Sequence, residues 1–244
     1  MKTFNFASVP KVLTALALVA SASSAMAAQT WDLGALCGSV ALGTTDDCGP
    51  LSLTGLSAPT SGSNFTAAAV IDYTPGGLGV VGSTETNTTG PHATDNKFGT
   101  DAMLIKFDTA TSLTALTVGW NGTTDGVGTL YNGSDLTVLA WNGTGAPPSM
   151  TGVAPSGLLS SGWTLIGNYA NVVGTQSIST AITSSYWLVS AYDTTYGGGL
   201  TAGNDAFKLV SVSGNQVPEP GSLVLLGAGL LGMAAVRRRN KSTV

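Results

Sequence analysis

Side chains that could carry out catalysis are scarce in this chain of 244 residues, which holds one His and two Cys. His92 follows Gly90 and Pro91 in a loop, and no Ser-His-Asp arrangement is supported around it. The two glutamates do not suit glycoside hydrolysis, because Glu219 lies in a Pro-Glu-Pro motif near the C-terminus and leaves Glu85 alone. We therefore expect no enzymatic activity, and a secreted hydrolase is the least favoured reading.

Oxygen ligands for a cation gather in two Gly-rich regions of the sequence. Asp95 stands six positions before Asp101, and Asp193 precedes Asp205. Carboxylate oxygens are ligands that Ca²⁺ prefers in proteins. Neither spacing matches an EF-hand loop, and Asp in such loops commonly stabilises turns. Calcium is thus one reading of these acids and turn formation is the other; no other cofactor is expected.

A short sequence motif that contains a tryptophan occurs twice in the chain. Residues 116–123 and 136–144 both end in Trp-Asn-Gly-Thr, and Asn-Gly after an alternating strand predicts a hairpin turn. A functional interpretation places Trp120 and Trp141 side by side as an aromatic platform for sugar rings, since flat aromatic faces suit apolar sugar surfaces. The alternative is that each indole closes one end of a hydrophobic core.

The composition indicates which elements must position these side chains. Hydrophobic residues make up 43% of the chain, which excludes a wholly disordered protein, and charged residues only 9%, against roughly 25% in ordinary soluble domains. Gly, Ser and Thr are abundant, which favours short strands and loops over helices. Residues 28–217 hold three Lys against twelve acidic residues, a net charge of −9 that excludes a nucleic-acid partner.

Short segments rich in Val, Leu, Ile, Thr or aromatics, each bounded by turn-forming residues, predict strands. They are Ala67–Tyr73, Leu78–Gly82, Ala102–Asp108, Leu113–Trp120, Leu136–Trp141, Trp163–Tyr169, Tyr186–Tyr192 and Ala206–Val212. The last alternates as a half-buried antiparallel strand does. No stretch between them has a helical period. We predict an all-β fold, an antiparallel β-sandwich of jelly-roll type, over residues 28–217.

Residues 1–27 have the plan of a secretory signal peptide. Two lysines provide positive charge, residues 12–20 are almost wholly apolar, and Ala25 and Ala27 form a small-residue cleavage site. We expect a signal helix that engages the Sec translocon and is removed by signal peptidase. In an exported protein, Cys37 and Cys48 are expected to form a disulfide, because the chain has no second group of Cys or His ligands for zinc.

Residues 218–244 contain three consecutive features. They are the motif Pro218, Glu219 and Pro220, the uncharged run Leu223–Val236, and the basic cluster Arg237, Arg238 and Arg239. As a helix the run of fourteen residues would be roughly 21 Å long, short of the roughly 30 Å hydrocarbon core. We predict a short transmembrane helix with its arginines in the cytoplasm and residues 28–217 outside.

Together these features resemble the PEP-CTERM sorting signal of Gram-negative bacteria; the alternative is an ordinary single-span anchor. The resemblance implies processing by an exosortase, after an inner-membrane intermediate, and delivery to the cell surface or extracellular matrix. The middle of the chain resembles a family of exosortase-dependent surface proteins with no assigned catalytic residues, at residues 101–108, 116–120, 135–140 and 203–209. We expect a structural surface or matrix protein. The alternative is a carbohydrate-binding module of the extracellular polysaccharide, with or without calcium.

Overall fold

Strands are the main regular structure of the computed structural model, which describes residues 28–83, 85, 92–97, 99–122, 133–217, 227–229 and 231–232. They are β1 (Gln29–Asp32), β2 (Asp46–Asp47), β3 (Leu51–Ala58), β4 (Thr66–Asp72), β5 (Leu78–Val81), β6 (Thr94–Asp95), β7 (Thr100–Asn121), β8 (Leu136–Trp141), β9 (Trp163–Tyr169), β10 (Gly174–Ser177), β11 (Ser184–Ala191) and β12 (Ala206–Gln216). The named helices are one turn long: α1 (Leu33–Leu36), η2 (Pro155–Gly157) and η3 (Thr194–Tyr196).

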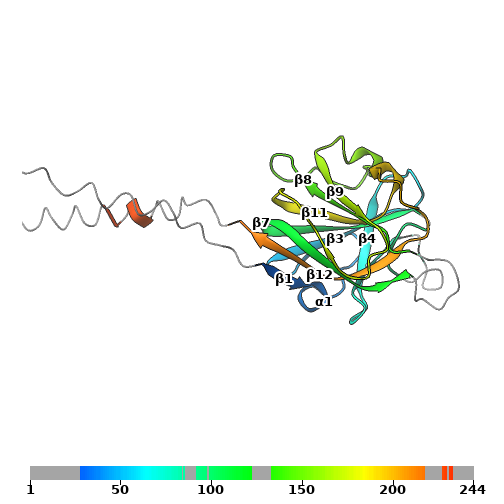
Figure 1. Ribbon diagram of the computed structural model, residues 1–244, viewed down its shortest axis with the longest axis horizontal. Coiled ribbons are helices and arrows are strands. Elements are labelled where there is room, and N and C mark those ends of the chain that lie inside the picture. Colours follow the sequence, from blue (N-terminus) through cyan, green and yellow to red (C-terminus); the bar gives the residue numbers. More distant parts are fainter. Residues whose placement is uncertain are drawn as a thin grey trace, which may run out of the picture.

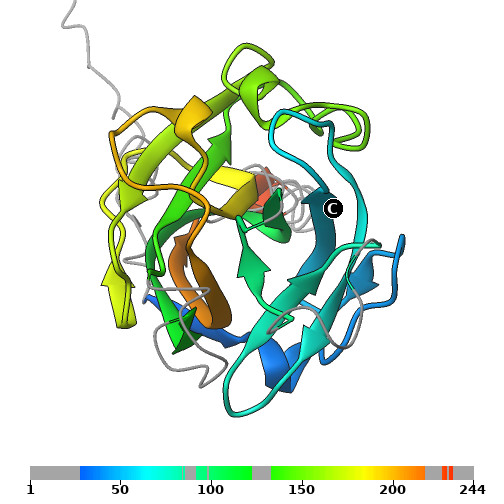
Figure 2. The same cartoon turned by 90° about the vertical axis from the view of Figure 1, so that its right-hand side faces the viewer.

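All strands belong to one antiparallel sheet, in which β7 joins two groups of strands that we call layers (Figure 1). Its first half pairs with β3 and β11, and its second half pairs with β12 and β10. The layers meet again through β4 and β5, which connect β3 to β12. In a view along the long axis of Figure 1, the strands therefore form a ring around the interior (Figure 2). The prediction of an all-β antiparallel fold is confirmed.

Alternating side chains divide the interior into two cores. In β7, Met103, Ile105 and Phe107 point into the main core, while Ala102 and Leu104 face the opposite side. A smaller apolar cluster covers that opposite side, to which the segment after β8 contributes Met150 and Leu158. The layer containing β7, β8 and β11 is thus buried on both faces, because the long connection between β8 and β9 shields its outer face.

Predicted and observed strands differ mainly where turn signals are weak. The predicted strands Ala102–Asp108 and Leu113–Trp120 form one continuous strand, since the four residues between them include no Gly or Pro. Strand β3 was not predicted, because Ser and Gly interrupt its apolar residues. Its Gly55 is required by close packing, as a Cβ there would lie 2.6 Å from the Ala68 carbonyl oxygen.

Strand β12 differs from the predicted half-buried strand, because residues 206–209 are buried on both faces. Lys208 is only 8% exposed, and its ammonium lies 4.0 Å from the ring centroid of Tyr73 and 4.7 Å from that of Trp120. Aromatic faces attract a desolvated cation. This stacking explains how a lysine is accommodated at a buried strand position.

Both ends of the β domain lie at one pole, which we call the tail pole. Strand β1 pairs with β12 so that Gln29 lies opposite Gly214, and Val217 follows β12 directly (Figure 1). Ala206, at the other end of β12, pairs with Asp95 at what we call the distal pole. Of the predicted run Leu223–Val236, residues 227–229 and 231–232 are described and are helical. Within the described residues, no helix combines the length and the apolar character needed to cross a membrane.

Candidate functional site

Three carboxylates meet at the distal pole. Asp95 comes from β6, Asp101 from the start of β7, and Glu85 from the connection between β5 and β6. They each offer an oxygen, and these oxygens all lie within 4.8 Å of one another. Asp95 and Asp101 are 5% and 3% exposed, and Glu85 is half-buried. The structure thus brings together the predicted pair Asp95 and Asp101 and adds Glu85, which sequence reasoning did not place there.

Electrostatics make this cluster retain protons. Burial raises the pKa of the Asp101 carboxyl well above its usual range, and the charges of Asp95 and Glu85 raise it further. Burial, followed by the charge of Asp95, raises the pKa of Glu85 to about 7. Within the described part of the chain, the buried Oε2 of Glu85 has no hydrogen-bond partner. Like charges this close cannot all ionise without a compensating proton or cation.

The other two calcium candidates do not join this cluster. Asp193 begins η3, where Oδ1 accepts hydrogen bonds from the Thr195 backbone at 2.9 Å and its hydroxyl at 2.7 Å, while Oδ2 accepts one from the Thr100 hydroxyl at 2.6 Å. Asp205 accepts from the Asp135 backbone N–H at 2.9 Å and from the Asn96 amide at 2.7 Å. These carboxylates stabilise turns and loops. Among the described residues, the acids that group closely enough to hold a divalent cation are Glu85, Asp95 and Asp101.

The cluster predicts that the protein becomes less stable as the pH rises. A carboxyl whose pKa is raised by folding stabilises the folded state. This stabilisation is complete when the pH is below the pKa of the group in the unfolded chain, near 4, and it is lost as the pH rises through the pKa in the folded protein. Burial also raises the pKa of Asp205 to about 6. Glu85, Asp101 and Asp205 therefore all act in this direction. From pH 5 to pH 8 we expect a loss of roughly 2 kcal/mol, after allowance for solvent screening of Glu85, and a fall in Tm of roughly 4–8 °C.

Thermal unfolding in a chelating buffer, followed by circular dichroism, measures this effect. Asp101→Asn removes the most buried carboxyl of the cluster, which must otherwise ionise in the interior as the pH rises. This variant should therefore be more stable than the wild type at pH 8 and show a flatter pH profile. Asp46→Asn, at a partly exposed acid outside the cluster, is the control. A divalent cation held by the three carboxylates would cancel the wild-type pH dependence, so a parallel titration in calcium tests them as a cation site. A Tm that stays constant from pH 5 to pH 8 in chelator would contradict the prediction.

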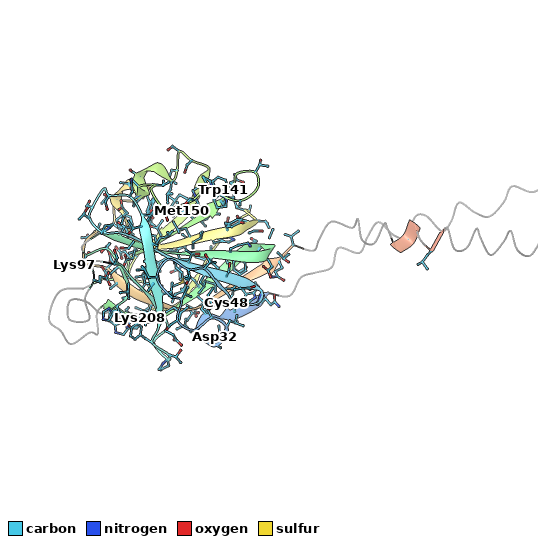
Figure 3. The ribbon with its side chains drawn as sticks, turned by 180° about the vertical axis from the view of Figure 1, so that it is seen from behind. Asp32, Cys48, Lys97, Trp141, Met150 and Lys208 are labelled. Atoms are coloured by element: carbon cyan, nitrogen blue, oxygen red, sulfur yellow. A yellow bond between two sulfur atoms is a disulfide. The ribbon has the colours of Figure 1, made fainter. Side chains whose placement is uncertain are left out.

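The two tryptophans of the predicted sugar platform do not lie side by side. Trp120 lies at the distal pole against Lys208, whereas Trp141 packs edge-on against Trp163 with ring centroids 5.7 Å apart. Lys208 and Trp141 are well separated on the molecule (Figure 3). The prediction that Trp120 and Trp141 together form one platform is therefore wrong. The two strands have similar sequences but different neighbours, because β7 ends beside β12 whereas β8 pairs with β9 and β11.

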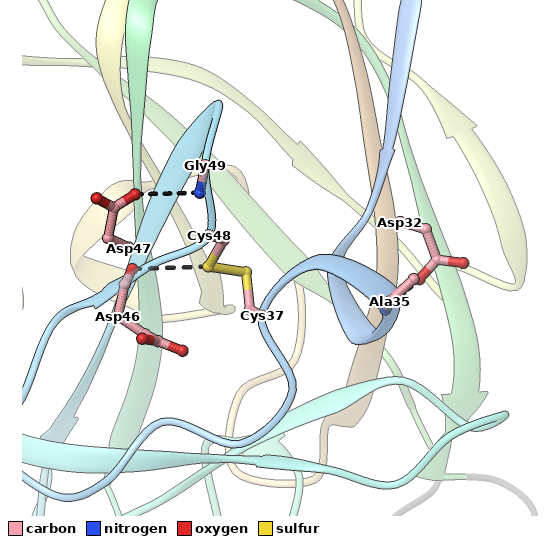
Figure 4. Close-up of a disulfide and its surroundings, with 7 residues drawn as sticks. All are labelled: Asp32, Ala35, Cys37, Asp46, Asp47, Cys48 and Gly49. Atoms are coloured by element: carbon pink, nitrogen blue, oxygen red, sulfur yellow. Dashed lines mark hydrogen bonds between the residues drawn. A yellow bond between two sulfur atoms is a disulfide. The ribbon is translucent and has the colours of Figure 1, made fainter.

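The predicted disulfide between Cys37 and Cys48 is present (Figure 4). Cys37 ends helix α1, whose first turn is capped by Asp32 through a 3.0 Å hydrogen bond from the Ala35 N–H. Cys48 is buried, and Asp47 just before it accepts a 3.0 Å hydrogen bond from the Gly49 N–H. The disulfide thus links the segment before β2 to the residues that lead into β3.

Comparison with known proteins identifies the C-terminal segment. Residues 216–239 match the family model of the PEP-CTERM protein-sorting motif, which confirms the resemblance. Such a motif implies exosortase processing and export to the cell envelope or surface of a Gram-negative bacterium. No curated protein matches the sequence. The predicted sorting, basic and cleavage residues lie outside the described residues: Pro218, Glu219, Pro220, Arg237, Arg238, Arg239, Ala25 and Ala27.

Proposed function

Because residues 216–239 carry a PEP-CTERM protein-sorting motif, we propose that this chain is a non-enzymatic structural protein of the cell surface or extracellular matrix. The Sec translocon exports it, signal peptidase removes residues 1–27, and the tail, residues 218–244, holds an inner-membrane intermediate until an exosortase acts. The sorting motif is the observation that carries this proposal. The scarcity of catalytic side chains supports a non-enzymatic role.

The place where the β domain ends supports processing of a folded protein. Val217 is the last residue described before the Pro-Glu-Pro sequence, and its N–H donates a 2.9 Å hydrogen bond to the Ala110 carbonyl of β7. Proline has no backbone N–H with which to extend this hydrogen-bonded pairing, and the sorting motif follows Val217 directly in the sequence. An exosortase would reach it without opening the domain.

Replacing Pro218, Glu219 and Pro220 together with Ala is expected to abolish surface delivery. Full-length protein should then accumulate in the inner membrane, because the exosortase no longer recognises its motif, while the β domain remains folded. Cell fractionation and mass spectrometry measure both outcomes. The matched control replaces Ser242 and Thr243 with Ala in the same tail and should be delivered normally.

Wild-type surface material is expected to end upstream of Leu223. Two findings would refute the sorting proposal: unchanged delivery of the triple variant, or peptides from residues 223–237 in mature surface protein. The carbohydrate-binding alternative, with or without calcium, depends on different residues and is tested separately.

A further inference from the structure

A cavity of about 410 Å³ opens at the tail pole, where the end of β8, the start of β11 and the middle of β7 come together. Its lining includes Trp141, Tyr186, Lys106, Asp108, Asn142 and Ser185. Ala110 also lines it and accepts the hydrogen bond from Val217, so the cavity lies next to the start of the tail. Its volume falls within the range of about 300–1,000 Å³ that is usual for small-molecule sites.

Trp141 forms a fixed aromatic wall of this cavity. Its indole N–H donates a 2.8 Å hydrogen bond to the Gly145 carbonyl, and its ring packs edge-on against buried Trp163. Gly143 and Gly162 pack closely against the same ring, since a Cβ at these positions would lie 2.2 Å and 2.7 Å from indole carbons. The partly exposed ring is therefore held in one orientation before any ligand arrives, which lowers the entropic cost of binding.

The backbone beside the indole is held equally firmly. The Ser184 hydroxyl donates to the carbonyl of Trp141 at 2.7 Å and accepts from the Tyr186 N–H at 3.0 Å. This one side chain links the end of β8 to the start of β11. Tyr186, which is half-buried and also lines the cavity, thus has its backbone held beside the end of β8.

The remaining polar groups of the lining are available to a ligand. Lys106, Asp108 and Asn142 are exposed, and none of their side chains forms a hydrogen bond or ion pair within the described part of the chain. Ser185 adds a hydroxyl. The positive charge of Lys106 offsets the negative charge of Asp108, so the lining favours neither an anionic nor a cationic ligand. A fixed aromatic surface beside amide, hydroxyl and charged groups suits a ligand with an apolar face and many hydroxyls.

We propose that this cavity binds a short segment of a neutral polysaccharide, with one sugar ring lying against Trp141 and its hydroxyls bonded to Asn142, Lys106 and Asp108. The inference is independent of sorting, because it depends only on the folded β domain. A polymer strand bound here lies beside the point where the tail leaves the domain.

Binding of cellohexaose, chitohexaose and isomaltohexaose to the protein, followed by tryptophan fluorescence and calorimetry, tests the proposal. We expect at least one of them to bind. Trp141→Ala should weaken that binding by about tenfold or more, and Asn142→Ala, at an exposed position that leaves the fold intact, by about fivefold. Trp120→Phe at the distal pole is the control and should bind like the wild type.

The proposal is overturned if none of the three oligosaccharides binds at millimolar concentration, or if Trp120→Phe weakens binding as much as the cavity variants do. It is also overturned if Asn142→Ala, shown to be folded by circular dichroism, binds like the wild type. Saturable binding of the synthetic peptide Val-Pro-Glu-Pro-Gly-Ser at the cavity without any sugar binding would assign the cavity to the tail instead. Each of these results leaves the sorting experiment unaffected.

Discussion

Trp187→Ala is expected to lower the free energy of unfolding by about 3–5 kcal/mol, a large part of the about 5–15 kcal/mol by which folded domains are usually stable. The side chain of Trp187 is 0% exposed in the main core. Its indole N–H lies 3.2 Å from the Thr111 carbonyl and 3.0 Å from that of Ser184. Thr111 stands where β7 passes from one layer to the other, so the alanine variant loses both core volume and a link at that crossing.

Urea unfolding followed by circular dichroism gives the size of this effect. Trp187→Phe keeps most of the apolar volume and loses the N–H donor, so it should be destabilised by only about 1–2 kcal/mol. Leu42→Ala, at an exposed side chain, is the matched control and should stay within about 0.5 kcal/mol of the wild type. A loss below about 1 kcal/mol for Trp187→Ala would contradict the assigned core.

Removing the disulfide with Cys37→Ser and Cys48→Ser is expected to lower stability by about 3 kcal/mol. The two cysteines are 11 positions apart, and the bond restricts the unfolded chain over that loop. Cys48 is also buried in the main core. The serine hydroxyl placed there must be desolvated, which adds a cost smaller than that of losing the disulfide. For a domain of this size, Tm should fall by roughly 6–12 °C.

Reduction provides the control for the cysteine variants. A reducing agent should lower the Tm of the wild type toward that of the double Ser variant and leave the variant itself unchanged. Intact mass after alkylation should show no free thiol in natively exported protein until a reductant is added. Alkylation of both cysteines without reductant would show that the bond does not form in the exported protein.

Local sequence patterns predict the strands well where clear turn residues flank them. The bounds of β8 and β9 agree with the prediction, because Asp and Asn surround β8 and Gly precedes β9. The crossing of β7 between layers was not predictable, because it depends on which strands pair with each half. Sequence patterns identify strands but do not identify their partners.

The same limit applies to the sites. Asp95 and Asp101 were predicted together from their short spacing, but Glu85 joins them only through the folding of the connection between β5 and β6. Trp120 and Trp141 share one local motif yet belong to different poles, because their strands have different neighbours. In both cases the tertiary arrangement, and not the local pattern, decides which side chains meet.

The position of β12 determines how the domain would carry a mechanical load. A protein held by its tail while the surrounding medium drags on its body is under tension that enters at Val217 and runs along β12. That strand pairs with β7 at nine positions and with β1 at four. Antiparallel hydrogen bonds lie perpendicular to the strands, so a pull along β12 loads them together in shear instead of peeling them apart one by one. The strand that leads into the sorting motif is thus well placed to resist extraction by force.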